Sequence, residues 1–236
     1  MHHVTRAVAL SAMAVGALAL AAAVGGIAPS AAPSGAGQGS VQTIDLAERL
    51  AAGRVRAVNR QATKADGRPG AVRVSEGAAE GVAWIEGIDF AEGTLEIDVR
   101  GRDAPQQSFV GVAFHRKDDK SYEAVYLRPF NFRATDPVRR DHALQYMSVP
   151  DFDWPRLRKE FPEEFENPVD QSLDPNGWVP VRVIVKGRAV QIFVGPGKAP
   201  ALEARKLGEL ARGGVGLWVG NNSSGDFANL RITPAR

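Results

Sequence analysis

The stretch WVPVRVIVKGRAVQIFVG, residues 178–195, decides the fold class. Val, Ile and Phe dominate it, and in its first half they alternate with polar residues, as in a strand that buries one face. The residues KGRA, 186–189, interrupt this pattern with a glycine and two cations, which is typical of a tight hairpin. Residues 178–195 therefore predict two neighbouring antiparallel strands.

The same pattern recurs along the chain as far as residue 233. In GTLEIDVRGR, residues 93–102, Leu95, Ile97 and Val99 share one face. The other expected strands, which are bounded by Gly, Pro, Asp or Asn, cover residues 71–76, 81–90, 108–116, 121–128, 142–149, 213–220 and 226–233. About ten to twelve strands without a regular alternation of helices predict an all-β protein, an antiparallel β-sandwich or jelly roll.

One helix is expected within this series, in DFDWPRLRKEFPEEFE, residues 151–166. Asp153 is a helix-capping residue type, Pro155 suits a first helical turn, and Pro162 ends the helix. We therefore expect residues 129–177 to form a long insertion that carries a short helix. Insertions of that length tend to shape binding sites. The alternative is that the aromatic side chains of this insertion cover one end of the core.

Composition limits the function classes. The chain has 236 residues, of which 44% are hydrophobic and 24% charged, and these values are typical of a globular protein. The net charge is +2 and no block of Lys or Arg stands out, so we expect no nucleic-acid partner. The absence of cysteine excludes disulfides, thiolate metal sites and a cysteine nucleophile. We expect residues 41–236 to form a single domain.

The N-terminal residues have the pattern of an export signal. Arg6 precedes the apolar run of residues 7–27, and Ala28 and Ser30 are small residues suited to the positions before a cleavage site. We expect a signal peptide at 1–30, a flexible linker at 31–40 and a periplasmic or extracellular protein. The alternative is an uncleaved membrane anchor, because the run reaches the ~20 residues that a spanning helix needs.

The C-terminal strands resemble those of a known superfamily. GGVGLWVGNNSSGDFANLRI, residues 213–232, is similar to the closing strands of concanavalin A-like lectin/glucanase sandwiches. The order of strands over residues 80–233 resembles that of secreted bacterial domains of this superfamily, nearest to those grouped as 3-keto-disaccharide hydrolases. The resemblance implies two large antiparallel sheets, face to face, one of them concave. In many relatives carbohydrate binds across the concave face, but such a pattern is specific for fold and not for activity.

A glucanase motif is incomplete in this chain. Secreted β-glucanases of the fold carry the pattern E-I-D-x-x-E on one strand. Here Glu96 and Asp98 share a face, but the next residue on that face is Arg100. A retaining glycosidase needs two carboxyl groups about 5 Å apart. We therefore interpret this face as a solvated outer face of the sandwich.

The best candidate for a ligand site surrounds SYEAVYLRPFNFR, residues 121–133, where alternation places Tyr126 and Arg128 on one face. Aromatic rings stack on sugars, and Arg, Asn and Gln side chains bond to sugar hydroxyl groups. The candidate ligand-binding residues, which share these chemical types, are Tyr126, Arg128, Asn131, Gln145, Tyr146 and Trp154. Gln145 and Tyr146 point to opposite faces of their strand, so the set cannot all line one surface.

The candidate catalytic residues are His115, Glu123 and His142, because an imidazole oriented by a carboxylate can act as a general base. Alternation places His115 on the same face as Gly111 and Ala113. The spacing of the histidines matches no metal-ligand motif, so we expect no metal site from them.

Two function classes follow from these residues, and a third remains. The first is a secreted carbohydrate-binding protein that recognises a saccharide on its concave face. The second is a glycoside hydrolase of the 3-keto-disaccharide type, in which a base removes the acidic proton beside the ketone. The third is a structural or partner-binding domain of the cell envelope. We predict no cofactor. The alternative is calcium, held by loop residues that are also turn sequences: Asp118, Asp119, Asn221, Asn222 and Asp226.

Overall fold

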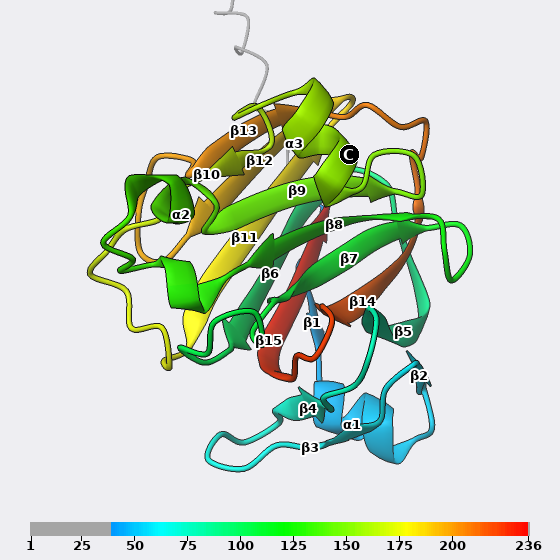
Figure 1. Cartoon of the computed structure of the whole chain (residues 1–236). Coiled ribbons are helices and arrows are strands. Elements are labelled where there is room, and N and C mark those ends of the chain that lie inside the picture. The colour runs from blue at the N-terminus through cyan, green and yellow to red at the C-terminus, as the bar shows by residue number, and fades with distance from the viewer. Residues whose placement is uncertain (1–38, 236) are drawn as a thin grey trace, which may run out of the picture. The chain divides into compact units, whose positions relative to one another are not determined.

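A computed structural model describes residues 39–235, which form two antiparallel β-sheets packed face to face (Figure 1). The predicted signal peptide and most of the predicted linker lie outside the described residues. No helix within residues 39–235 has the length and apolar character that crossing a membrane requires.

Sheet A lies behind sheet B in the view of Figure 1 and has eight strands in the described part of the chain. In spatial order they are β13 (Leu202–Arg205), β12 (Ala189–Val194), β11 (Val179–Lys186), β6 (Gly93–Arg100), β15 (Gly225–Pro234), β4 (Val72–Val74) and β3 (Ala62–Lys64), with β1 (Gln42–Ile44) paired to β15. The predicted hairpin is present, because β11 and β12 pair antiparallel up to the pair of Lys186 and Ala189.

Sheet B has seven strands over the same described range. In spatial order they are β10 (Glu166–Asn167), β9 (Leu144–Val149), β8 (Tyr122–Leu127), β7 (Val110–Arg116), β14 (Gly213–Val219), β5 (Gly81–Phe90) and β2 (Val55–Val58). The order departs from the order along the chain, since β14 lies between β7 and β5. The predicted all-β sandwich is therefore confirmed.

Alternation decides what each sheet buries. In β6, Leu95 and Ile97 are buried between the sheets. Glu96, between them in sequence, points to the outer face of sheet A and forms an ion pair with Arg231. The structure therefore places this carboxylate on a polar, ion-paired surface, as the interpretation of the incomplete glucanase motif expects.

The insertion of residues 129–177 extends sheet B and also covers part of it. It contains the 3-10 helix η1 (Pro129–Asn131) and helix α2 (Pro137–Asp141), and its strands β9 and β10 complete one edge of the sheet. The predicted helix is α3 (Trp154–Glu160), which Asp153 caps by accepting a hydrogen bond from the backbone N–H of Arg156 at 3.1 Å. The first helix, α1 (Leu46–Ala51), has no counterpart among the predicted elements.

Candidate functional site

One row of paired residues crosses five strands of sheet B and forms the floor of the candidate site. Trp218 of β14 lies opposite Gly111 of β7, and Gly111 lies opposite Tyr126 of β8. The row continues through Gln145 of β9 to Glu166 of β10. Side chains paired in this way point to the same face of a sheet. This face, which points away from sheet A, is called the outer face of sheet B.

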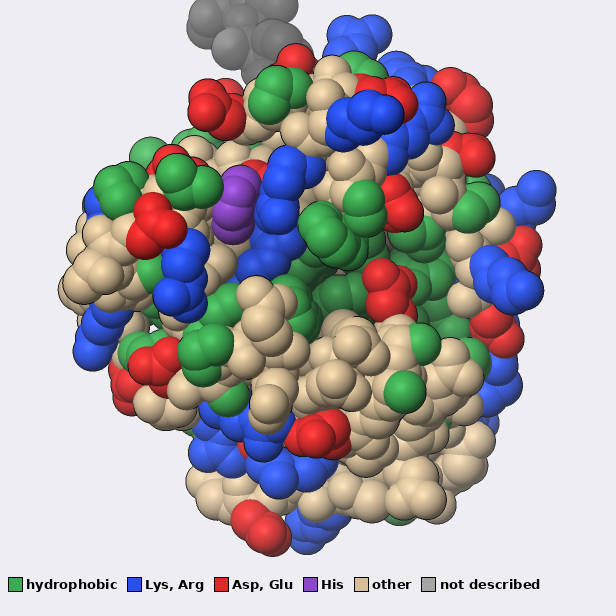
Figure 2. Space-filling view, viewed as in Figure 1, with side chains coloured by type: hydrophobic (Ala, Val, Ile, Leu, Met, Phe, Trp, Pro, Cys, Tyr) green, Lys and Arg blue, Asp and Glu red, His purple; other side chains and the backbone are tan. Residues whose placement is uncertain are grey.

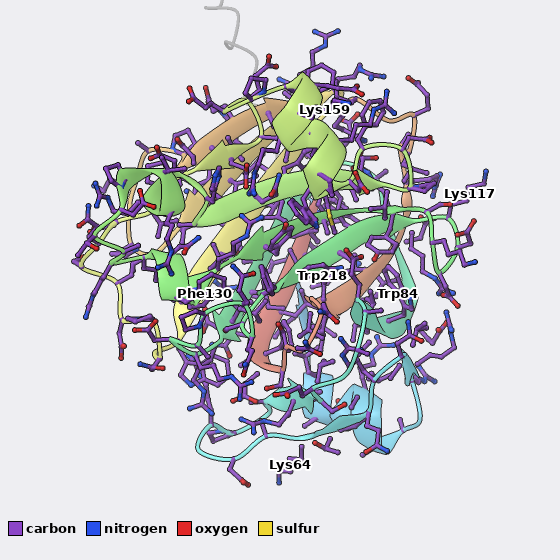
Figure 3. All side chains as sticks on the ribbon, in the orientation of Figure 1. Lys64, Trp84, Lys117, Phe130, Lys159 and Trp218 are labelled. Carbon is purple, nitrogen blue, oxygen red and sulfur yellow. The ribbon has the colours of Figure 1, made fainter. Side chains whose placement is uncertain are left out.

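Gly111 lets the two aromatic rings beside it meet. Because Gly111 has no side chain, the rings of Trp218 and Tyr126 stack across it with centroids 4.6 Å apart. A Cβ atom at this position would lie 2.7 Å from the Cβ of Tyr126. Figure 3 shows Trp218 on β14, on the side of the sheet that faces the viewer. Each ring is only 2% exposed, so the pair forms a packed aromatic floor beneath the site.

A pocket of about 510 Å³ opens over this row, a volume within the range of small-molecule sites. Its aromatic lining consists of Phe109, Tyr126, Phe130, Trp154 and Trp218. Its ionisable lining consists of Glu80, Arg128, Arg139, His142 and Arg158. Gln106, Asn131, Gly220, Asn221 and Asn222 complete it. Figure 2 shows the hollow, with hydrophobic side chains at its bottom, cationic side chains along one side and acidic ones beside it.

Helix α3 places an aromatic ring and a cation on one side of the pocket. Trp154 and Arg158 are four residues apart, so they lie on the same face of the helix. Leu157 is buried in the core and holds the helix against the sheet. Trp154 is 43% exposed, although a side chain of this size is usually well covered. The Arg158 guanidinium lies 5.1 Å from the centre of its ring.

Glu166 gathers the cations at this side of the pocket. Arg158 donates two hydrogen bonds to its carboxylate, from Nε at 3.0 Å and from Nη2 at 2.6 Å. Arg128 donates a third from Nη1 at 3.0 Å, and the Nδ1 atom of His142 lies 3.0 Å from Oε2. One buried carboxylate is thus shared by two guanidinium groups. This side of the pocket, which we call the basic end, keeps a surplus of positive charge.

Arg128 belongs to the floor of the pocket, since it is 5% exposed. Its Nη1 also donates to the His142 carbonyl at 2.6 Å, and its Nη2 donates to the Tyr126 hydroxyl at 2.9 Å and to Gln145 Oε1 at 2.7 Å. Burial raises the pKa of Tyr126 to about 12, so the phenol keeps its proton and donates it to Gln145 Oε1 at 3.2 Å. These bonds fix the guanidinium and the ring as one rigid unit.

Asn131 offers the pocket an acceptor with no protein donor. It is 4% exposed and lines the pocket, and its Oδ1 has no hydrogen-bond partner within residues 39–235. Its Nδ2 donates a long hydrogen bond, 3.4 Å, to the His142 carbonyl. Buried polar atoms in folded proteins are nearly always paired. This acceptor in the wall of the pocket is therefore left unfilled by the described residues.

Glu80, in the segment before β5, is the acidic group of the lining. Tyr122 donates its hydroxyl proton to Glu80 Oε2 at 3.0 Å, and the Trp218 indole donates to that hydroxyl oxygen at 3.3 Å. Burial raises the pKa of Glu80, and the hydrogen bonds from Tyr122 and Trp218 oppose this rise. Glu80 is thus a second hydrogen-bond acceptor, positioned through Tyr122 by the aromatic floor.

His142 is the imidazole of the basic end. Burial is the main cause that lowers its pKa, Glu166 opposes the shift, and Arg158 and Arg128 add to it. Because the pKa falls below its ordinary value of 6.5, the ring is neutral at pH 7.

His115 does not reach the outer face of sheet B, so the prediction that it shares a face with Gly111 and Ala113 is wrong. The pairing of β14 with β7 shifts register between Gly214 and Gly216, which marks a β-bulge, and His115 has a φ of 52°. A bulge adds one residue to a strand and reverses the direction of the side chains beyond it. The His115 ring therefore points between the sheets.

His115 joins a closed network of polar side chains, which we call the core network. Its Nδ1 lies 2.8 Å from Glu123 Oε2 and 3.1 Å from Lys206 Nζ, and its Nε2 donates to the Ala91 carbonyl at 2.7 Å. Tyr146 donates its hydroxyl proton to Glu123 Oε1 at 3.0 Å. None of His115, Glu123 and Tyr146 lines the pocket. These three side chains lie on the opposite face of the sheet, so the structure does not bring them together with the residues of the pocket.

The other sequence-predicted residues converge. Tyr126, Arg128, Asn131, His142 and Trp154 line one pocket, and Gln145 lies in its floor beneath Arg128.

Sequence reasoning missed several lining residues, among them Glu80, Arg158 and Trp218. Gly216 shares a face with Trp218, but the ring of Trp84 covers this glycine, so the glycine did not mark the open part of the surface.

The carboxylates suggested for calcium have protein partners. Asp119 forms ion pairs with Arg56 and Arg116, and Asp226 forms ion pairs with Arg73 and Arg100. The described residues contain no group of three His, Asp or Glu side chains arranged to hold a metal ion.

Comparison with solved structures identifies the architecture. The carbohydrate binding module CBM66 from Bacillus subtilis matches with a TM-score of 0.56 and 12% identity over 76% of this chain and 95% of that chain. A Bacillus subtilis protein of unknown function with a galectin-like fold matches with a TM-score of 0.56 and 11% identity over 85% of this chain and 99% of that chain. The fold is a concanavalin A-like jelly roll.

A third structure, the metal-free carbohydrate recognition domain of Emp46p, matches this jelly roll with a TM-score of 0.50 and 8% identity over 81% of this chain and 94% of that chain. At these identities the likeness concerns the fold alone. No protein-family model matches the sequence, and no curated protein matches it.

Proposed function

We propose that this protein is an exported carbohydrate-binding protein whose pocket on the outer face of sheet B holds a saccharide. The observation that carries the proposal is the exposed Trp154 ring beside the stacked rings of Trp218 and Tyr126, in one pocket with unpaired hydrogen-bonding groups. Sugars need this mixture of flat apolar surfaces and directed polar groups. Two structural neighbours, CBM66 and the Emp46p domain, are a carbohydrate binding module and a carbohydrate recognition domain, and this likeness and the signal-like N-terminus support the proposal.

Each side of the pocket has a distinct role in this proposal. Trp154, on α3, stacks on the exposed face of a sugar ring. The floor formed by Trp218 and Tyr126 limits how deeply the sugar enters the pocket. Asn131 Oδ1 and Glu80 accept hydrogen bonds from sugar hydroxyl groups. These acceptors cannot pair with each other, so a ligand with several O–H donors satisfies both.

The proposal is tested by measuring the binding of a panel of oligosaccharides to the wild-type protein and to a variant of Trp154. Trp154→Ala removes an exposed ring, so the fold is expected to persist. We expect the affinity for the sugar selected by the panel to fall roughly five- to twentyfold, the loss typical of an aromatic contact. The control is Val138→Ala, which removes another exposed apolar side chain, 62% exposed and outside the pocket lining. A panel without any binder, or equal affinity in both variants, contradicts the proposal.

A second candidate function is cleavage of a 3-keto glycoside, which the position of His142 favours. Its neutral imidazole lines the pocket and can accept the acidic proton beside a ketone. His142→Gln should then abolish turnover of 3-keto disaccharides while it leaves their binding in place. If wild-type protein binds such disaccharides without turnover, this candidate is excluded.

A further inference from the structure

We propose that the saccharide is anionic, and that its carboxylate or sulfate group lies at the basic end of the pocket, beside Arg139, His142 and Arg158. This inference rests on the proposed function and adds the chemical class of the ligand. The ionisable lining holds three arginines against one glutamate. Glu80, that glutamate, is tied to Tyr122 of β8 and not to the arginines.

The basic end lacks enough carboxylates of its own. Glu166 receives both Arg128 and Arg158, so one positive charge of that pair remains. Arg139 adds another, because it is exposed on α2 and forms neither an ion pair nor a side-chain hydrogen bond within the described residues. Guanidinium groups bind carboxylate and sulfate oxygens by charge-assisted hydrogen bonds. The surplus charge therefore matches an anionic substituent.

The acceptors among the lining residues fit an anion that belongs to a larger polar molecule. The Oδ1 atom of Asn131 has no donor from residues 39–235, and it is buried against the pocket. An acceptor of this kind repels a free anion and needs an O–H or N–H donor. Cations at one end, acceptors along the wall and aromatic rings above and below together match a sugar that carries both hydroxyl groups and an acidic group.

Matched pairs of sugars test the inference. We would titrate the full chain with galacturonate and galactose oligomers of equal length, and with a sulfated oligosaccharide and its unsulfated parent. The acidic member of a pair should bind at least tenfold more tightly, and its advantage should shrink as NaCl is raised. The two pairs show whether the pocket prefers carboxylate or sulfate.

Two variants locate the anion. Arg139→Ala should lower the affinity for the acidic sugar about fivefold or more and change that for the neutral sugar by less than about twofold. The reason is that Arg139 has no protein partner among the described residues, so its removal deletes only its contact with the anion. Lys159→Ala is the control, because it removes one exposed positive charge from α3 outside the pocket lining. It should leave both affinities unchanged within about twofold.

The outcomes separate this inference from the proposed function. Equal binding of acidic and neutral sugars overturns the inference and leaves the proposed function in place. No binding of any sugar overturns both. An acidic preference that survives in Arg139→Ala and is lost in Lys159→Ala places the anion elsewhere and overturns the assigned position.

Discussion

The two faces of sheet B hold polar clusters of nearly the same composition. The core network between the sheets combines His115, Glu123, Tyr146 and the ammonium group of Lys206. The cluster on the outer face combines an imidazole, a glutamate, a tyrosine and two arginines around Glu166. In both clusters a buried carboxylate holds several donors.

The two clusters differ in what they leave unpaired. Every member of the core network is at most 4% exposed, and none of its side chains has an unpaired polar atom. On the outer face, Asn131 Oδ1 and Gln145 Nε2 have no partner within residues 39–235. Residue types therefore do not separate a structural cluster from a ligand site. The direction of each side chain across the strand does.

The largest expected effect is the loss of stability when the core network loses its carboxylate. Glu123→Ala leaves the Lys206 ammonium and the His115 ring buried without their anion. Removing one partner of a buried ion pair costs about 3–5 kcal/mol. Urea denaturation followed by tryptophan fluorescence measures the free energy of unfolding.

Glu209→Ala is the control for this substitution. The Glu209 side chain is 90% exposed and forms a surface ion pair with Arg188, so its loss should cost less than about 1 kcal/mol. Equal losses in both variants would mean that the core network contributes no special stability.

A smaller effect is expected at the outer face, where a substitution should lower the affinity for the saccharide and leave the stability nearly unchanged. Asn131→Leu removes an unpaired buried oxygen, so the free energy of unfolding should change by less than about 1 kcal/mol. Affinity for the saccharide should fall roughly threefold to tenfold, the value of one hydrogen bond. Thermal unfolding and calorimetric titration of the same sample measure both. A variant that loses stability without losing affinity would assign Asn131 to the structure and not to the site.

The smallest expected effect is a dependence of affinity on pH, and its source is His142. The lowered pKa of His142 first affects the free energy of unfolding. Its contribution to stability is present above pH 6.5 and is lost as the pH falls, because the unfolded chain then takes up a proton that the folded chain resists. Glu166 and Asp141 favour the protonated ring, and Arg158 and Arg128 oppose it.

A bound anion beside His142 adds to the groups that favour protonation. The affinity for an acidic sugar should therefore rise, by less than about tenfold, from pH 7.5 to about pH 5.5. Glu80, across the pocket, has a pKa that burial raises, so it takes up a proton at a higher pH than an ordinary glutamate does. His142→Gln separates the two contributions, since it should flatten the rise. An unchanged pH profile in this variant would exclude His142 as the cause.

The fold could be predicted from the sequence wherever strands are long and alternate. Strand β5 has the expected bounds, Gly81–Phe90, and the hairpin of β11 and β12 is confirmed. Residues 41–70 gave no signal, because β1 and β3 have three residues each and are too short to show a period.

The candidate site was harder to predict because it depends on the register between distant strands. Alternation grouped Tyr126 with Arg128, and Asn131 follows them closely along the chain, at the end of η1. A bulge at His115 has no mark in the sequence, and one extra residue moved that side chain to the other face. Glu80 and Arg158 enter the pocket from separate elements, and no spacing along the chain links them.

The most direct test of the saccharide pocket uses the four tryptophans of the chain as internal probes. In ¹⁵N-labelled protein each gives an indole N–H signal. Titration with the bound oligosaccharide should shift the signals of Trp154 and Trp218, which line the pocket. It should not shift the signal of Trp178, whose ring contacts Arg100 of sheet A and Arg68 in the loop between β3 and β4. A ligand that shifts Trp178 and not Trp154 or Trp218 would contradict the account.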